Sequence, residues 1–225
     1  MSGKPVIALD GPAGSGKSTV SRRLAQALEL RYVDTGAMYR VVGVLAERQG
    51  IDVGDVPALE ALCQSLDLRF EERADGLHVL ADGHDLTHAI RTAEAGQLAS
   101  KVSVVPQVRE RLVALQRGMA AGGGVIMEGR DIGTVVLPDA TLKIFLVASA
   151  PERARRRCAD FAARGEPADV TQVTREIEER DRRDQTRAHS PLTPAADALV
   201  IDTTSEGIEA VVSRVCRLLA GRQDS

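Results

Sequence analysis

The chain has no asparagine and no tryptophan, and aromatic residues supply only 2% of its 225 residues. The missing asparagine excludes the N-K-x-D loop with which guanine-specific GTPases read their base. The scarcity of aromatic rings leaves almost no platform on which single-stranded nucleic acid could stack. A formal net charge of −3 also argues against a nucleic-acid or anionic-membrane surface as the main partner. We therefore expect a protein that binds neither nucleic acid nor membrane.

Cysteine is scarce, and lysine is much rarer than arginine. The three cysteines, Cys63, Cys158 and Cys216, are scattered and form no C-x-x-C pair, so neither a disulfide framework nor a zinc site is expected. Four lysines stand beside 25 arginines. Guanidinium groups bind phosphate in a planar, bidentate manner, but a genome that favours arginine codons would give the same composition. The positions of the arginines must therefore decide between the two explanations.

Long apolar runs are missing as well. No run approaches the roughly 20 residues of a membrane-spanning helix, and no charged-then-apolar leader precedes the first apolar segment. A hydrophobic content of 44% and a charged content of 27% are typical of a soluble globular protein. A chain of this length forms one large domain or a domain with an insert. We expect a cytoplasmic monomer.

The strongest local signal is GPAGSGKST at residues 11–19, which fits G-x-x-x-x-G-K-S. In such a phosphate-binding loop (P-loop), glycines let backbone N–H groups surround a phosphate, and the following helix adds its positive end. Lys17 is expected to reach the β- and γ-phosphates of ATP, and the Ser18 hydroxyl to ligate Mg²⁺. The predicted ATP-binding residues are Gly11, Pro12, Ala13, Gly14, Ser15, Gly16, Lys17, Ser18 and Thr19.

The surroundings of the loop fit this interpretation. An apolar strand over residues 6–9 precedes it, and a helix follows it with one apolar face. The residues expected on that face are Val20, Leu24, Ala27 and Leu28.

Strands and helices alternate along most of the chain. Further strands are expected at residues 30–34, 125–127, 142–147 and 198–201. This pattern predicts an α/β fold of three layers (αβα) around a five-stranded parallel sheet, with ligands gathered at the carboxyl ends of the strands. Residues 66–87 instead alternate apolar and polar residues across Asp-Gly turns, which predicts a small antiparallel β insert.

Arginines cluster late in the chain, with ten of them between residues 153 and 187. Arg153, Arg156 and Arg157 share one face of an expected helix, and a second expected face carries Arg180, Asp184 and Arg187. Eight acidic residues in the same stretch equally suit a solvent-exposed helix with ion pairs between its turns.

Six stretches together resemble the bacterial cytidylate kinases, a family of nucleoside monophosphate kinases. They are DGPAGSGKST, YVDTGAMYR, LASKVSVVPQVRE, GRDIGTVVLPDA, KIFLVAS, and EERDRRDQTRAHSPL with PAADALVID. The P-loop alone indicates phosphate binding, whereas DTGAMYR, GRDIGTVV and RDRRD are specific to this family. The resemblance covers nearly the whole chain. It implies a single P-loop kinase domain over residues 1–225, a monophosphate-binding region at 36–105 with its β insert at about 66–90, and a short lid at 151–168.

The activity that the resemblance implies is phosphoryl transfer from ATP to CMP and dCMP, with Mg²⁺ as cofactor. Lys17, Arg130, Arg180 and Arg187 would be the catalytic cations. The implied CMP-binding residues are Thr35, Arg40, Ser100, Arg109, Arg130, Asp131, Arg180, Asp184 and Arg187.

Within that set, Ser100, Arg109 and Asp131 would read the cytosine, and Asp184 with Arg180 would contact the sugar. The lid arginines are Arg153, Arg156 and Arg157. We take Arg157 as the ATP ligand, although the sequence does not decide among the three. Glu128 stands where a related sequence has aspartate, and it is a candidate ligand of Mg²⁺ or water.

Two alternatives remain open on the residues themselves. The first is a P-loop kinase for another small acceptor, such as a different nucleotide, shikimate or gluconate. The GRD and RDRRD arginines, together with the insert, argue against it. The second is a non-catalytic, ATP-dependent switch without an acceptor, and the two arginine-bearing regions beyond the P-loop argue against that.

Overall fold

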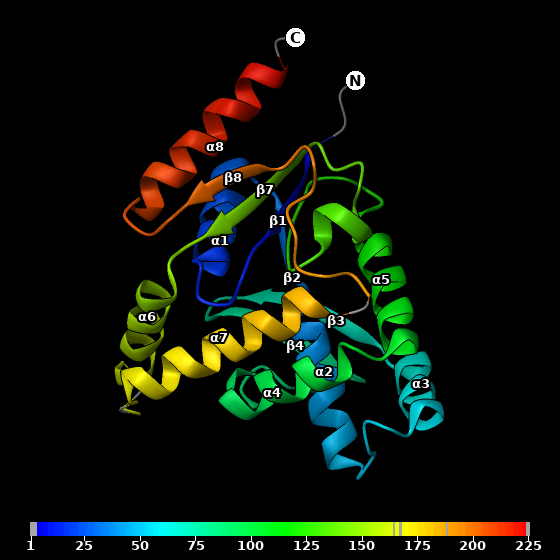
Figure 1. The fold of residues 1–225 in the computed structure, drawn as a ribbon. Helices are drawn as coiled ribbons and strands as arrows, with labels where there is room; N and C mark the ends of the chain where they lie inside the picture. The colour runs from blue at the N-terminus through cyan, green and yellow to red at the C-terminus, as the bar shows by residue number, and fades with distance from the viewer. Residues whose placement is uncertain (1–3, 164, 167, 188, 224–225) are drawn as a thin grey trace. The chain divides into compact units, whose positions relative to one another are not determined.

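The computed structural model describes residues 4–163, 165–166, 168–187 and 189–223 (Figure 1). The chain divides into two compact units. The first, which we call the P-loop unit, comprises residues 1–32 and 122–225, and the second, the helical unit, comprises residues 33–121.

A five-stranded parallel sheet forms the centre of the P-loop unit. Its order is β2 (Arg31–Asp34), β6 (Val125–Glu128), β1 (Val6–Asp10), β7 (Leu142–Val147) and β8 (Leu199–Asp202), and β2 crosses from this unit into the next. In the register of the central strands, Leu9 lies opposite Glu128, and Asp10 lies opposite Phe145. The carboxyl ends of β1, β6 and β7 therefore reach one edge of the sheet together. The predicted fold class and the five-stranded sheet are confirmed.

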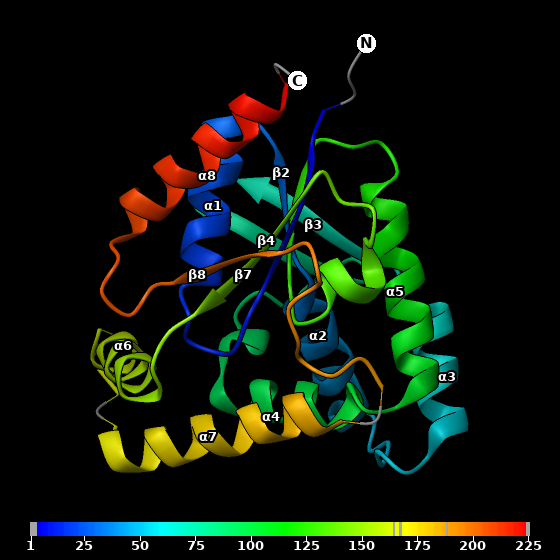
Figure 2. The same ribbon diagram turned by 45° about the horizontal axis from the view of Figure 1, so that its top comes forward.

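Helices α1 (Lys17–Leu28) and α8 (Ile208–Gln223) pack side by side and share one apolar cluster with the sheet (Figure 2). Helix α1 begins at Lys17, as the motif predicts, and it buries Val20, Leu24 and Ala25. The expectation for Ala27 was wrong, because Ala27 is exposed and Ala25 takes its place. Val20 and Leu24 are buried as expected, and the half-buried Leu28 packs against the same apolar cluster.

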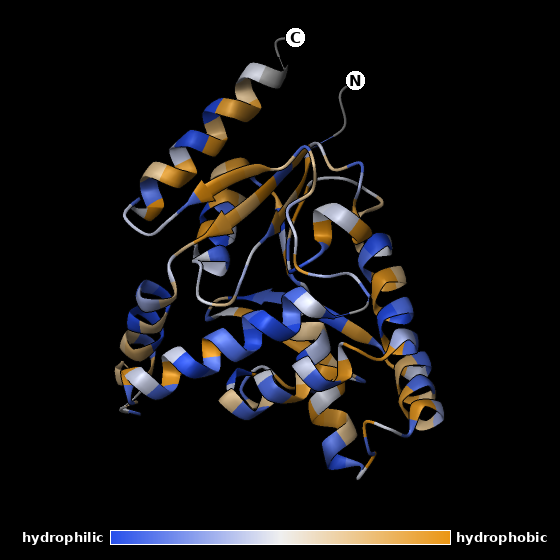
Figure 3. Ribbon diagram, in the orientation of Figure 1, coloured by the Kyte–Doolittle hydropathy of each residue, from blue (hydrophilic) through white to orange (hydrophobic). Residues whose placement is uncertain are grey.

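Helices α6 (Ala150–Ala162) and α7 (Val170–Thr186) form a pair in the same unit. Ala154, Val173 and Ile177 make a small apolar core between them. Figure 3 shows that α7 is otherwise strongly hydrophilic. A π-helical turn, η2 (Ile132–Val136), follows β6 and was not expected from the sequence. Within the described residues, none of the helices combines the length and the apolar content that a membrane span requires.

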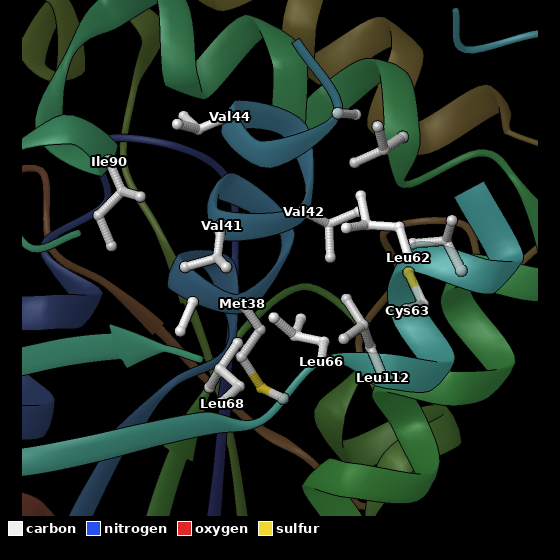
Figure 4. Packing of buried hydrophobic residues seen from close by; sticks show 14 of the residues in the cluster. Met38, Val41, Val42, Val44, Leu62, Cys63, Leu66, Leu68, Ile90 and Leu112 are labelled. Atoms are coloured by element: carbon white, nitrogen blue, oxygen red, sulfur yellow. The ribbon is translucent and has the colours of Figure 1, made fainter. Parts of the chain in front are cut away.

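The helical unit contains α2 (Thr35–Arg48), α3 (Val56–Ser65), η1 (Ala89–Arg91), α4 (Ala93–Val102) and α5 (Pro106–Ala120). It also contains the predicted antiparallel insert, as a separate sheet of β3 (Leu68–Arg73), β4 (Gly76–Ala81) and β5 (His84–Asp85). Helix α3 was not expected. Figure 4 shows its Leu62 and Cys63 in one cluster with Met38 and Val42 of α2.

The crossing of α2 and α4 depends on a glycine. A Cβ on Gly43 would lie 2.7 Å from Leu98 Cβ and 3.0 Å from the Leu98 carbonyl carbon. Real Cβ atoms do not approach other atoms so closely, so any larger residue at position 43 must push the two helices apart.

We predict that Gly43→Ala lowers the free energy of unfolding by about 1–3 kcal/mol, because overpacking outweighs the gain in helix propensity. Gly118→Ala in α5 is the matched control, since a Cβ there meets no atom within 4 Å. That control should raise the free energy of unfolding by about 0.5–1 kcal/mol. Urea unfolding of both variants measures the difference, and equal stability of the two would contradict the close packing at Gly43.

Candidate active site

Residues 11–16 form a tight loop between β1 and α1. A Cβ on Gly11 would lie 2.1 Å from the carbonyl oxygen of Leu146, so only glycine fits there. Gly16, with φ of +88°, occupies the N-cap position of α1 and forms no side-chain capping bond. The first turn of α1 contains no acidic residue. Neither a cap nor an acidic side chain in the first turn therefore neutralises the positive end of α1, which adjoins the loop and can bind a phosphate.

Lys17 lies at the centre of this positive region. Its side chain is buried, and Nζ donates a hydrogen bond to the carbonyl oxygen of Pro12 at 2.7 Å. Burial lowers the pKa of Lys17 well below its ordinary value, and the charges of Arg130 and Arg180 act in the same direction. Glu128 and Asp10 oppose this effect without cancelling it. A group with several negative charges would relieve the repulsion among these cations.

Ser18 and Glu128 form an oxygen-rich site beside Lys17. The Ser18 hydroxyl donates to Glu128 Oε1 at 2.7 Å, and the Tyr32 hydroxyl donates to the same oxygen at 2.8 Å. Glu128 ends β6 and is buried. Hydroxyl and carboxylate oxygens are the ligands that Mg²⁺ prefers, so the two side chains fit this ion.

Two ion pairs gather the predicted acceptor residues of the P-loop unit. Arg130 Nε donates to Asp184 Oδ2 at 3.0 Å, and Arg187 Nη2 lies 3.6 Å from Asp131 Oδ1. Burial alone would raise the pKa of Asp184, but the positive charges of Arg130, Arg180 and Arg187 hold that pKa below its usual value. The structure thus brings these five charged side chains near one another.

Arg187 does not share a helical face with Arg180 and Asp184, and this expectation was wrong. Helix α7 ends at Thr186, and Arg187 follows in an extended conformation. The chain then folds back, because the backbone N–H of Leu192 donates to the carbonyl oxygen of Asp184 at 2.8 Å. Arg187 Nε donates to the carbonyl oxygen of Ser190 within this returning segment.

The three arginines of α6 have different surroundings. Arg153 is buried, and it donates to the carbonyl oxygen of Ala13 at 3.1 Å and to Asp181 Oδ2 of α7 at 2.5 Å. It therefore joins the P-loop to α7. Arg156 donates to Glu152 Oε1 at 2.8 Å and to Thr203 Oγ1 at 3.1 Å.

Arg157 lies over the ring of Phe161, with 5.4 Å between the guanidinium carbon and the ring centroid. It forms no hydrogen bond or ion pair with any residue that the structure describes. Of the three arginines, Arg157 therefore has the most donors left for an external anion.

In the helical unit, Asp34 holds Arg40 in place. Asp34 caps α2, with Oδ1 accepting a hydrogen bond from the backbone N–H of Ala37 at 3.1 Å. Its other oxygen, Oδ2, accepts from Arg40 Nη2 at 2.7 Å. Thr35, the first residue of α2, is buried beside them. One carboxylate thus starts the helix and orients a guanidinium.

Ser100 and Arg109 lie on α4 and α5 of the helical unit. The Arg109 guanidinium is buried and lies over the ring of Tyr39, 6.0 Å from its centroid, with Nη1 donating to the Tyr39 hydroxyl at 3.5 Å. Among the described residues, no hydrogen bond joins Ser100 to Arg109. The structure therefore fixes the Arg109 side chain but does not pair it with Ser100.

Two residues that contact the loop segments were missed. Asp10 accepts hydrogen bonds from the backbone N–H groups of Ile132 and Gly133. The Thr203 hydroxyl lies 3.0 Å from the carbonyl oxygen of Ser15, inside the P-loop. A charged residue that ends the buried strand VIALD was an available signal for Asp10, whereas nothing in the sequence around Thr203 distinguishes it.

The P-loop unit offers backbone N–H groups, one ammonium and several guanidinium groups to a ligand. Such an arrangement holds phosphates and neutralises the charge that develops during phosphoryl transfer. Such a transfer needs no nucleophilic side chain of the protein.

Known proteins with similar sequences agree with this chemistry. The family model for cytidylate kinase matches residues 7–220. A cytidylate kinase of Pelotomaculum thermopropionicum is 54% identical over 226 residues, which cover 100% of both chains. That of Syntrophotalea carbinolica is 47% identical and covers 99% of this chain and 95% of its own.

One solved structure shares the fold at low sequence identity. It is an uncharacterized protein from Eubacterium ventriosum, 11% identical, and the match covers 96% of this chain and 99% of that one with a TM-score of 0.53. This likeness concerns the fold alone. The family match and the two close relatives extend over almost the whole sequence, and on that ground the chain belongs to the cytidylate kinase family.

Proposed function

We propose that this protein transfers the γ-phosphoryl group of ATP to CMP and dCMP, giving ADP and the corresponding diphosphates. Membership of the cytidylate kinase family supports the substrate class. The observation that carries the proposal is the cluster of Lys17, Arg130 and Arg180, whose mutual repulsion favours a ligand with several negative charges.

On the donor side, the loop from Gly11 to Thr19 and the start of α1 hold the phosphates of ATP. Lys17 turns from the Pro12 carbonyl oxygen to the β- and γ-phosphates. Arg157 adds a further cation from α6. Ser18 and Glu128 would hold Mg²⁺, which when bound neutralises charge on the phosphates.

On the acceptor side, Arg130, Arg180 and Arg187 hold the phosphate of CMP. Asp184 contacts the sugar, and Asp131 accepts from the amino group of the base. In the helical unit, the family resemblance assigns Thr35 and Arg40 to the phosphate of CMP and Ser100 and Arg109 to its base.

Catalysis then consists of positioning and charge neutralisation. The acceptor phosphate is already an anion, so no general base of the protein is required. An arginine that closes over the reacting groups also excludes water, which would otherwise hydrolyse ATP.

A panel of acceptors tests the proposal against its two alternatives. ADP release by the purified protein is measured with CMP, dCMP, UMP, AMP, shikimate, gluconate, and no acceptor. Release that depends on CMP or dCMP supports the proposal. Dependence on a different acceptor, or release without any acceptor, would favour another kinase or a nucleotide-dependent switch, respectively.

We further infer that the protein acts in the cytoplasm as a monomer, without nucleic acid or membrane as a partner. Its net charge of −3 and its scarcity of aromatic residues argue against nucleic acid and anionic membranes as partners. Light scattering on the purified protein tests the monomeric state, since a monomer has a mass of 24.0 kDa.

The first prediction for this function concerns Lys17. Lys17→Ala removes the cation that follows the γ-phosphoryl group in the transition state, and we expect kcat to fall about a hundredfold or more. Lys4→Ala is the control, because Lys4 is exposed at the start of the described chain. Turnover near that of the wild type at saturating ATP would refute the role of the loop.

The second prediction concerns Arg187. Arg187→Ala should raise the KM for CMP about tenfold or more, because a charge-assisted contact to the acceptor phosphate is lost. The KM for ATP should change little. Arg182→Ala on the exposed side of α7 is the control. A loss of ATP affinity with an unchanged KM for CMP would place Arg187 on the donor side instead.

The third prediction concerns the choice of base. Cytosine presents an N4 amino donor and an N3 acceptor, where uracil presents O4 and N3–H. A carboxylate at Asp131 and a guanidinium at Arg109 suit cytosine and mispair with uracil. Each mispairing costs about 1–3 kcal/mol, so we expect CMP to be preferred over UMP about a hundredfold or more in kcat/KM.

Asp131→Ala should reduce this preference chiefly by impairing the use of CMP. Steady-state kinetics with both nucleotides measure the ratio in wild type and variant. A wild-type ratio near one, or an Asp131→Ala protein with undiminished preference, would mean that other residues read the base.

A further inference from the structure

Asp10 is a buried carboxylate that has no assigned contact with ATP or with the acceptor. It ends β1, immediately before the P-loop, and only 4% of its surface is exposed. Burial raises the pKa of Asp10 to about 6, against the lowering effect of hydrogen bonds from the backbone N–H groups of Gly133 and Ile132. A buried carboxylate costs folding free energy, so its presence here indicates a role other than packing.

The partners of Asp10 belong to a different strand connection. Oδ1 accepts from the N–H of Ile132 at 2.9 Å, and Oδ2 accepts from the N–H of Gly133 at 2.8 Å. These are the first two residues of η2, and they directly follow Arg130 and Asp131. The end of β1 is thereby joined to the turn that presents these two side chains.

Asp10, rather than the N-cap residue Asp131, accepts hydrogen bonds from the first N–H groups of η2. Asp131 occupies the N-cap position of η2, where an aspartate side chain usually accepts from the backbone of its own turn. It makes no such capping bond. Its carboxylate instead lies 3.6 Å from Arg187 Nη2. Because Asp10 satisfies the first N–H groups of η2, the turn does not need the Asp131 carboxylate as its cap.

Lys143 and Asp10 both lie next to Gly133 of the turn, and further hydrogen bonds lie inside the turn. A Cβ on Gly133 would lie 3.2 Å from Lys143 Cδ and 3.5 Å from Asp10 Oδ2. Inside the turn, the carbonyl oxygen of Asp131 accepts from the N–H groups of Val135 and Val136, at 2.9 Å and 3.2 Å. Asp10 and these two internal bonds together hold the backbone at the start of the turn.

We propose that Asp10 is a positioning residue that fixes Arg130 and Asp131 relative to the P-loop and so contributes to selectivity for the acceptor base. This rests on the proposed function, from which the acceptor roles of Arg130 and Asp131 are taken. Asp10 itself contacts neither substrate in this assignment. It acts through the backbone of η2.

The test uses Asp10→Asn. An asparagine can accept from one of the two N–H groups but turns its own amide N–H₂ toward the other, so one bond is lost and two donors oppose each other. We expect kcat/KM for CMP to fall about tenfold or more, because a small displacement of positioning groups has a large effect on rate. The KM for CMP should rise and the preference for CMP over UMP should shrink, while the KM for ATP stays within about threefold of wild type.

Two controls separate positioning from other effects. Val215→Ala in the buried face of α8 lowers stability away from the site, and it should leave both KM values and the CMP-to-UMP ratio unchanged. Asp139→Asn changes an exposed carboxylate downstream of the same turn and should have no effect. If Asp10→Asn acted only by removing a negative charge near Lys17, kcat would fall equally for every acceptor, and the CMP-to-UMP ratio would not change.

The outcomes are distinct. A folded Asp10→Asn protein with a CMP-to-UMP ratio within about twofold of wild type would overturn the inference, as would equal changes in the KM values for ATP and CMP. If Asp10→Asn does not fold, Asp10→Ser leaves one short hydroxyl that cannot accept from both N–H groups, and an unchanged ratio in that variant overturns the inference equally. The wild type is measured in the same series. A wild type that releases no ADP in response to CMP refutes the proposed function, whereas an active wild type with unaffected variants refutes only the role of Asp10.

Discussion

Concentrated positive charge at the carboxyl ends of β1 and β6 is the constraint around which the P-loop unit is organised. Lys17, Arg130 and Arg180 repel one another strongly enough to lower the pKa of Lys17 beyond what burial does alone. The protein offers these cations a carbonyl oxygen at Pro12 and a carboxylate at Asp184. A polyphosphate offers more negative charge than either group, so a phosphate ligand can displace these internal acceptors.

The ion pairs in this unit serve geometry more than stability. Arg130 with Asp184, and Arg153 with Asp181, are largely buried, with side-chain exposures from 6% to 20%. The desolvation of such groups consumes much of their attraction, and replacing a buried pair with apolar residues is often neutral or stabilising. A carboxylate partner, unlike an apolar one, holds the guanidinium in a defined orientation. Asp34 does the same for Arg40 in the helical unit, where it also starts α2.

The sequence predicted what depends on local pattern. The P-loop, the start of α1 at Lys17, the five strands of the parallel sheet and the antiparallel insert all follow from spacing, glycine placement and alternation. The departure of Arg187 from the face of α7 could not be predicted, because it depends on a backbone bond between Leu192 and Asp184 across a returning segment. The turn η2 was missed for a similar reason. Its hydrogen-bond acceptor, Asp10, lies more than a hundred residues earlier in the chain.

The surroundings of the arginines on α6 depend on tertiary structure and could not be predicted from helical periodicity. Helical periodicity places Arg153, Arg156 and Arg157 on one side of a helix, but it does not say what that side faces. Arg153 lies so close to the P-loop that a Cβ added to Gly14 would be 3.1 Å from the Cβ of Arg153. The Arg153 guanidinium donates hydrogen bonds to the Ala13 carbonyl oxygen and to Asp181. Arg157, one turn further along, lies only over an aromatic ring among the described residues. Two chemically identical side chains on one helix thus differ because of their tertiary surroundings: Arg153 is buried and bound to the P-loop backbone, whereas Arg157 is half-buried and forms no hydrogen bond with a described residue.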